Sequence, residues 1–156
     1  MRILGVTHLE PFANYFHGTS VCLVADGKVE FAVAEERFTR IPQFAGYPAC
    51  SLNHIFERYM LSWKDIDAIA LPWPEYGNTI ESMNSQVDSG HTFNGVPVLH
   101  VNHQTAHAYS VLPYCPFDSG YILTMDGMGF DDEQVSCGGL FKFSEDMPLT
   151  QVRQPI

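Results

Sequence analysis

Residues 19–36, TSVCLVADGKVEFAVAEE, decide the fold of the first third of the chain. Two apolar runs rich in valine flank Asp26-Gly27, and Asp-Gly between such runs is among the strongest signals of a two-residue β-hairpin turn. Upstream, the apolar run at residues 3–6 predicts another short strand. The first third is therefore predicted to be a strand, a loop and a β-hairpin.

Further along the chain, helical and extended patterns alternate. Apolar side chains at helical spacing predict a helix over residues 48–60. Short apolar runs predict strands at residues 66–71 and 96–101, and the polar stretch 74–95 between them is predicted to be a long loop. Asn102 can cap a helix that Pro113 stops. The coarse order is βββαβα.

A repeat then becomes visible. Residues 121–126 (YILTMD) resemble the first strand, and two further predicted strands, 135–144 and 148–154, repeat the earlier strand, turn and strand. The second copy stops there. This predicts an α/β fold with a first lobe at residues 1–118 and the opening three strands of an incomplete second lobe at 119–156. The alternative is that any two β-meanders look alike.

Length and charge limit the class of protein. The chain has 156 residues, 46% of them hydrophobic, and a net charge of −10. It can bury a core, and its acidic balance disfavours binding to nucleic acid. No apolar run reaches the roughly 20 residues of a membrane span, and the N-terminus lacks the apolar core of a secretion signal. We therefore expect a cytoplasmic protein that binds neither nucleic acid nor membrane.

The four cysteines give no sign of chemistry. They are widely separated and contain no CxxC pair, which suits neither a zinc ribbon nor a dense disulfide framework. Cys22 lies in an apolar run, where a buried structural thiol is the simpler interpretation. No cysteine is assigned a chemical role.

The sharpest candidate site is the stretch 100–108, HVNHQTAHA. His103 and His107 are four residues apart on the predicted helix, so both imidazoles project from one face, a spacing that suits two ligands of one metal ion. Imidazole favours Zn, Fe, Ni or Cu over Mg or Ca. Such a pair also arises by chance, and a complete site needs a further ligand, usually a carboxylate, from elsewhere in the chain.

Two weaker candidates remain open between function and structure. Asp126, Gly127 and Gly129 follow an apolar strand, where glycines admit phosphate oxygens and a carboxylate can hold a metal ion or a water. Asp-Gly is also an ordinary turn. His17 precedes two hydroxyl side chains and could serve acid/base work, although a loop histidine is more often structural.

Four segments taken in order resemble a known family. They are HGTSVCLVADGKVEFAVAEERFTR (residues 17–40), GYP (46–48), HQTAHAYS (103–110) and ILTMDGMG (122–129). By itself EERFTR is a charged strand end with an ion pair. Together the segments resemble the N-terminal part of the NodU/CmcH-type O-carbamoyltransferases, and EERFTR and HQTAHA are the most specific parts.

The resemblance implies an actin-like ATPase (ASKHA) fold of two RNase H-like lobes. It implies transfer of a carbamoyl group from carbamoyl phosphate, with ATP and through a carbamoyl-adenylate, to a hydroxyl of a sugar-like or other small metabolite. The implied cofactors are Fe(II) or another divalent metal, and ATP with Mg²⁺. The family's YrdC-like domain and its later metal-ligand aspartate are expected outside these 156 residues.

The resemblance also implies roles for single residues. His103 and His107 are the expected metal ligands, Asp126, Gly127 and Gly129 the expected nucleotide-side residues, and His17 the expected catalytic histidine.

Three departures from the family affect these roles. Residues 41–43 (IPQ) replace a usual basic pair, Phe130 replaces a usual glutamate, and Gly18 follows His17 where the family commonly has an aspartate. Because the later ligand, the rest of the second lobe and the YrdC-like domain are expected outside these residues, we expect an N-terminal fragment or truncated relative that is inactive alone. The alternative is a non-catalytic binding or assembly protein on the same half-fold, which could self-associate through its incomplete second sheet.

Overall fold

The computed structural model describes residues 1–7, 9, 18–72, 92–131 and 134–153. They fall into two compact units, residues 1–71 with 77–99 and residues 72–76 with 100–156. His17 and most of the predicted loop 74–95 lie outside the described residues. The two units are therefore described one at a time.

The first unit is built on a six-stranded mixed sheet. Its strand order is β3-β2-β1-β4-β6-β5, with β1 antiparallel to β2 and parallel to β4. Asp26 and Gly27 have φ angles of 49° and 80° and form the turn of the predicted hairpin between β2 and β3. The strands are β1 (Arg2–Val6), β2 (Ser20–Ala25), β3 (Lys28–Ala34), β4 (Ala68–Leu71), β5 (Thr92–Phe93) and β6 (Val96–His100).

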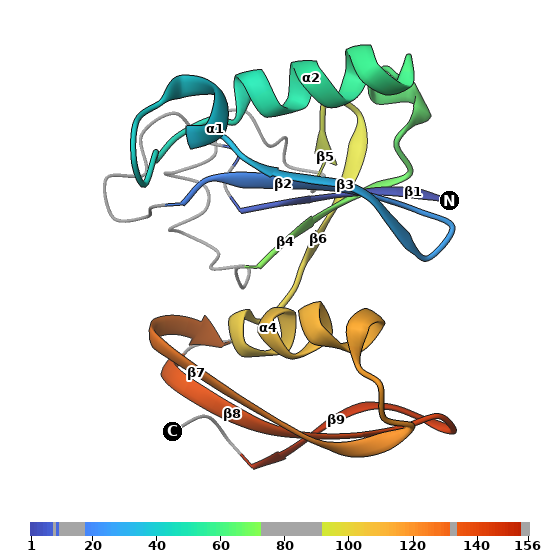
Figure 1. Cartoon of the computed structure of the whole chain (residues 1–156), viewed down its shortest axis with the longest axis vertical. Coiled ribbons are helices and arrows are strands. Elements are labelled where there is room, and N and C mark those ends of the chain that lie inside the picture. Colours follow the sequence, from blue (N-terminus) through green and yellow to red (C-terminus); the bar gives the residue numbers. More distant parts are fainter. Residues whose placement is uncertain (8, 10–17, 73–91, 132–133, 154–156) are drawn as a thin grey trace. The chain divides into compact units, whose positions relative to one another are not determined.

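The helices of this unit cover one face of the sheet, as Figure 1 shows. They are α1 (Glu36–Thr39), α2 (Ala49–Tyr59) and the short 3₁₀ turn η1 (Trp63–Asp65). Leu52 and Ile55 of α2 are buried together with Leu4, Leu23 and Ile69 of the sheet. The apolar stripe predicted for residues 48–60 therefore faces the core of this unit.

One strand falls where the sequence predicted a loop. Thr92 and Phe93 form β5, which pairs antiparallel with β6, and Phe93 is buried. Asn94 and Gly95 have φ angles of 52° and 80°, so they make the same type of tight turn as Asp26-Gly27. The unit thus carries three strands after α2. The sequence predicted two of them, at residues 66–71 and 96–101, and the structure adds β5 between them.

The second unit is an antiparallel meander covered by one helix. Its strands β7 (Ser119–Asp131), β8 (Gln134–Ser144) and β9 (Met147–Arg153) form the sheet β7-β8-β9, so the three strands predicted for this part of the chain are present. The helix α4 (His103–Val111), followed by the turn η2 (Leu112–Tyr114), lies across one face of this sheet (Figure 1). Phe141, Phe143 and Ala108 are buried.

Two boundaries differ from the predicted ones. The compact units divide between residues 99 and 100, not between 118 and 119, because α4 packs on β7 and β8. The strand β7 also continues through Asp131, where a glycine loop was predicted after Asp126, with a register shift between Met125 and Gly129. Gly127 and Gly129 therefore sit within an irregular strand.

The four cysteines are free, and burial raises the pKa of the Cys22 thiol. Within the described ranges, no helix is both long and apolar enough to cross a membrane.

Candidate metal centre

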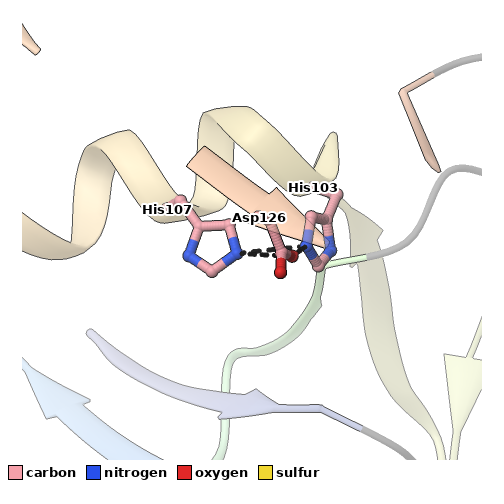
Figure 2. Close-up of side chains that lie close together, drawn as sticks. All are labelled: His103, His107 and Asp126. Carbon is pink, nitrogen blue, oxygen red and sulfur yellow. Dashed lines mark hydrogen bonds and ion pairs between the residues drawn. The ribbon is translucent and has the colours of Figure 1, made fainter. Parts of the chain in front are cut away.

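Three side chains of the second unit converge on one point (Figure 2). His103 and His107 come from α4, and Asp126 comes from β7. The Oδ2 atom of Asp126 lies 2.6 Å from Nε2 of His103 and 3.3 Å from Nε2 of His107. The two Nε2 atoms are 3.0 Å apart. The described residues contain this one group of three ligand atoms that could hold a metal ion.

The helix sets the spacing of the two imidazoles. Residues four apart lie about one turn apart on the same helix face, and the two rings meet edge to face with centroids 4.7 Å apart. The helix begins at His103, as predicted, but Asn102 contributes its backbone carbonyl and no side-chain cap. The side chain of His103 is 13% exposed and that of His107 is 49% exposed, so the site opens at His107.

The backbone orients the carboxylate. The N–H of Gly127 donates to Oδ1 of Asp126 at 2.6 Å, which leaves Oδ2 directed at the imidazoles. The hydrogen bond with His103 lowers the pKa of Asp126 below its ordinary value, and the Gly127 N–H and His107 act in the same direction against partial burial. Asp126 is therefore ionised at neutral pH, the form in which a carboxylate binds a metal.

The donor set fits a divalent transition metal. Around a tetrahedral ion with bonds of about 2.0–2.1 Å, neighbouring ligand atoms lie ~3.3 Å apart. The three separations are 2.6, 3.0 and 3.3 Å, so small adjustments would place one ion between them. Two imidazoles and one carboxylate suit Zn²⁺ or Fe(II) and leave a coordination position for another ligand.

The two glycines predicted on the nucleotide side lie beside this cluster in different ways. A Cβ atom added to Gly129 would clash with the imidazole ring of His103, so a side chain there would displace the imidazole. A Cβ atom added to Gly127 would meet nothing within 4 Å. Gly129 therefore lets β7 approach His103 closely, whereas Gly127 contributes its N–H group to Asp126.

No sequence pattern links Asp126 to the two histidines. The carboxylate ligand is expected from elsewhere in the chain, and the family resemblance places Asp126 beside a nucleotide. The available signal was the position of Asp126 at the end of an apolar run, where a carboxylate can hold a metal ion. Pairing it with α4 required the packing of that helix on β7.

The comparison with known families identifies the class of protein. The profile of the family described as Carbamoyltransferase N-terminus matches residues 2–83, just over half of the chain. The chain therefore belongs to this family, as the resemblance predicted.

Curated relatives agree with this assignment. The chain is 28% identical over 137 residues to the nodulation protein NolNO of Sinorhizobium fredii, covering 74% of this chain and 20% of that protein. It is 26% identical over 159 residues to an uncharacterized protein of Synechocystis sp., covering 80% of this chain and 26% of that protein. The chain thus spans about a quarter or less of the length of these relatives.

Solved structures confirm the actin-like ATPase fold class. YeaZ from Pseudomonas aeruginosa matches with a TM-score of 0.57 and 13% identity, covering 99% of this chain and 65% of that one. An uncharacterized protein with similarity to peptidase YEAZ from the same organism matches with a TM-score of 0.55 and 14% identity, covering 98% of this chain and 64% of that one. At 13% and 14% sequence identity, these similarities show a shared fold only.

Proposed function

We propose that this chain supplies the metal-binding part of an ATP-dependent O-carbamoyltransferase. The single observation that carries the proposal is the convergence of His103, His107 and Asp126 within one unit of a chain of this family. Fe(II), or another divalent metal, is the proposed ion. The three side chains would hold it through two nitrogen atoms and one carboxylate oxygen.

With a divalent ion bound, the candidate metal centre would suit an anionic ligand. Asp126 is ionised and supplies one negative charge, so a divalent ion bound there retains a net positive charge. A bound ion of this kind would neutralise negative charge on nucleotide phosphates. The partial exposure of His107 gives such a ligand access from solvent.

The proposed overall reaction is that of the family. Carbamoyl phosphate is hydrolysed to carbamate and phosphate, and a carbamate oxygen attacks the α-phosphorus of ATP to give carbamoyl-adenylate and pyrophosphate. The acceptor is a hydroxyl of a sugar-like or other small metabolite. The acceptor oxygen attacks the carbamoyl carbon, AMP leaves, and a base takes the hydroxyl proton. The proposed base is His17, on the resemblance alone, and the proposed location is the cytoplasm. The 156-residue chain is proposed to be inactive by itself, because its metal-side residues alone do not preorganise the reaction.

Metal binding tests the first part of the proposal. We expect isothermal titration with Zn²⁺, and with Fe(II) under anaerobic conditions, to give one ion per chain. The variants His103→Ala and His107→Ala should lose this binding, whereas His54→Gln, in the first unit between Phe31 and Phe38, should retain it. Equal binding by wild type and both alanine variants would contradict the proposed ligands.

Pyrophosphate release tests the second part. The chain is incubated with ATP, Mg²⁺, carbamoyl phosphate and Fe(II), and we expect no release above background. The same assay on a full-length protein that contains this segment should give release that depends on His103. Turnover by the 156-residue chain would overturn the proposed inactivity.

A second candidate function is that of an assembly protein that pairs with a second copy of itself. Tyr121, Leu123 and Met125 alternate along β7 and are 64%, 63% and 83% exposed, whereas Thr124 between them is buried. They form an apolar row on the sheet face opposite α4, and β9 ends the described sheet with one neighbour.

Light scattering separates the two candidates. A tight dimer that Leu123→Lys dissociates would favour assembly. A monomer that binds one metal ion would favour the enzyme part.

A further inference from the structure

A buried polar pair joins α4 to β7 beside the candidate ligands. Thr124 donates its hydroxyl hydrogen to Oε1 of Gln104 at 2.6 Å. Gln104 is fully buried and Thr124 is 6% exposed. Gln104 follows His103 directly, and Thr124 precedes Asp126 by two residues. Each partner of the pair is therefore tied through a short piece of backbone to one ligand of the candidate metal centre.

Little buried apolar surface holds α4 at one position along the strand. The buried residues of α4 are Gln104 and Ala108, which are one turn apart and place a polar amide and a single methyl group against the sheet. Apolar packing is non-directional, and so small an apolar surface gives α4 little resistance to sliding. A hydrogen bond depends steeply on distance and angle, so it specifies one position of the helix along the strand.

The ligand geometry demands such precision. The axial rise of an α-helix is about 1.5 Å per residue, so a slide of one residue is more than half of the 2.6 Å between His103 Nε2 and Asp126 Oδ2 and would disturb the convergence of the three ligand atoms. The imidazole of His103 also cannot move closer to β7, because it already lies directly against Gly129. The hydroxyl of Thr124 also lies 3.4 Å from the carbonyl oxygen of Gly139, a longer contact within the sheet that does not involve α4.

We propose that Gln104 and Thr124 are positioning residues of the metal centre. Their hydrogen bond sets the position of α4 along β7 so that the three ligand atoms converge. This inference rests on the proposed metal binding. It assigns a task to two residues that touch neither metal nor substrate.

The test uses the complete 156-residue chain, Co²⁺ as the probe, and four variants. Visible absorption of bound Co²⁺ reports both affinity and coordination geometry. Urea unfolding without metal reports stability. Thr124→Val and Gln104→Leu each remove one partner, the double variant removes both, and Thr124→Ser keeps the hydroxyl. Thr19→Val is the matched control, because Thr19 is fully buried in the first unit and donates to the carbonyl oxygen of Gly46.

Each single variant should weaken Co²⁺ binding about 10- to 100-fold and alter the absorption spectrum, as expected when support for metal ligands is removed. Thr124→Ser should stay within about threefold of wild type, since it keeps the donor. The double variant should regain part of that stability, because neither member of the pair then keeps a polar group that has lost its partner in the other, but it should still bind Co²⁺ weakly. Thr19→Val should lose stability without loss of affinity.

Three outcomes would count against the proposal in different ways. A double variant that regains both stability and wild-type affinity would show that the pair only stabilises the fold. Single variants that bind Co²⁺ like wild type would overturn the positioning role directly. A wild-type chain that binds no Co²⁺ would overturn the proposed metal site and this inference together.

Discussion

Two carboxylates beside the first turn of a helix meet very different partners. Glu35, at the start of α1 and 1% exposed, accepts hydrogen bonds from the N–H groups of Cys50 and Ser51 at 2.8 Å and from the Ser51 hydroxyl at 2.5 Å. Asp126 is 34% exposed, and its Oδ2 faces the imidazoles of His103 and His107.

The partners decide what each carboxylate can do. Backbone N–H groups donate and have no lone pair for a metal, so the cluster around Glu35 is closed. Imidazole nitrogens can bind a metal through a lone pair, so the cluster around Asp126 can accept an ion. Glu35 thus anchors the N-terminus of α2, where the helix dipole favours an anion. Asp126 remains available to bind a metal ion.

The Glu35 cluster also explains part of the EERFTR segment. The sequence predicted a charged strand end with an ion pair, and Arg37 does lie 3.6 Å from Glu36 at the surface. Glu35 beside them is buried and structural. Burial raises the pKa of Glu35, but the hydrogen bonds from Ser51 and Cys50 outweigh it and hold the pKa below its ordinary value.

The largest expected effect is on metal affinity. Asp126→Ala removes the one carboxylate of the candidate metal centre, so Zn²⁺ affinity should fall about 100-fold or more, a loss of about 2.7 kcal/mol. Isothermal titration measures it, with Asp118→Asn, an exposed carboxylate ahead of β7, as the control. An unchanged Zn²⁺ affinity would show that Asp126 is not a metal ligand and does not differ from Glu35 in this respect.

A comparable loss of stability is expected at Glu35. Glu35→Gln keeps the size of the side chain but replaces one acceptor oxygen by an NH₂ group that faces N–H donors. The free energy of unfolding should fall by about 2–3 kcal/mol in urea, with Zn²⁺ affinity unchanged. A variant as stable as wild type, or one that loses metal, would refute the structural assignment of Glu35.

The pH dependence of stability follows from the same carboxylate. Because the pKa of Glu35 is lower in the folded chain than in the unfolded one, its contribution is fully present above the unfolded value of about 4.3 and is lost as pH falls through the folded value. The stability gap between wild type and Glu35→Gln should therefore be constant from pH 7 to about 5.5 and shrink below that. If the stability gap widened on acidification, the pKa of Glu35 would have to be raised in the folded chain, which would contradict this prediction.

A smaller effect is expected at the glycine beside His103. Gly129→Ala forces the imidazole away, so Zn²⁺ affinity should fall about tenfold, or about 1.4 kcal/mol. Gly127→Ala is the matched control, because its Cβ would meet nothing within 4 Å. Equal affinities of the two variants would show that the close contact at Gly129 does not hold the ligand in place.

The smallest effect is expected at the surface ion pair. Arg37→Ala should change the free energy of unfolding by less than about 0.5 kcal/mol, because its ion pair with Glu36 lies at the surface, where water screens it. Thermal unfolding in low and high salt measures it. If Arg37→Ala lost as much stability as Glu35→Gln, the exposed charges of the EERFTR segment would stabilise the fold as much as the buried Glu35 does.

Local signals predicted much of the first unit. Asp26-Gly27 and the apolar runs around it predicted the β2–β3 hairpin, and the spacing of Leu52 and Ile55 predicted α2, because turn geometry and helix amphipathicity are short-range properties. The same kind of turn signal, Asn94-Gly95, lies at the end of a polar stretch for which the composition predicts a loop. The short strand β5 is therefore not predicted there.

The candidate metal centre could be predicted only in part. The two histidines on one helix face follow from local periodicity, but their carboxylate lies 19 and 23 residues away in sequence. Its approach depends on how α4 packs on β7, including the close contact at Gly129 and the buried Gln104–Thr124 pair. Those are tertiary contacts, which neither composition nor spacing specifies.

X-ray absorption at the zinc edge of the Zn²⁺-loaded chain tests the central claim most directly. The account predicts one ion with nitrogen and oxygen ligands at about 2.0–2.1 Å, outer scattering from two imidazoles, and loss of the ion in the His103→Ala, His107→Ala double variant. A sulfur ligand at about 2.3 Å would assign the metal to a cysteine such as Cys137 instead. That result, or a chain that retains no metal, would contradict the account.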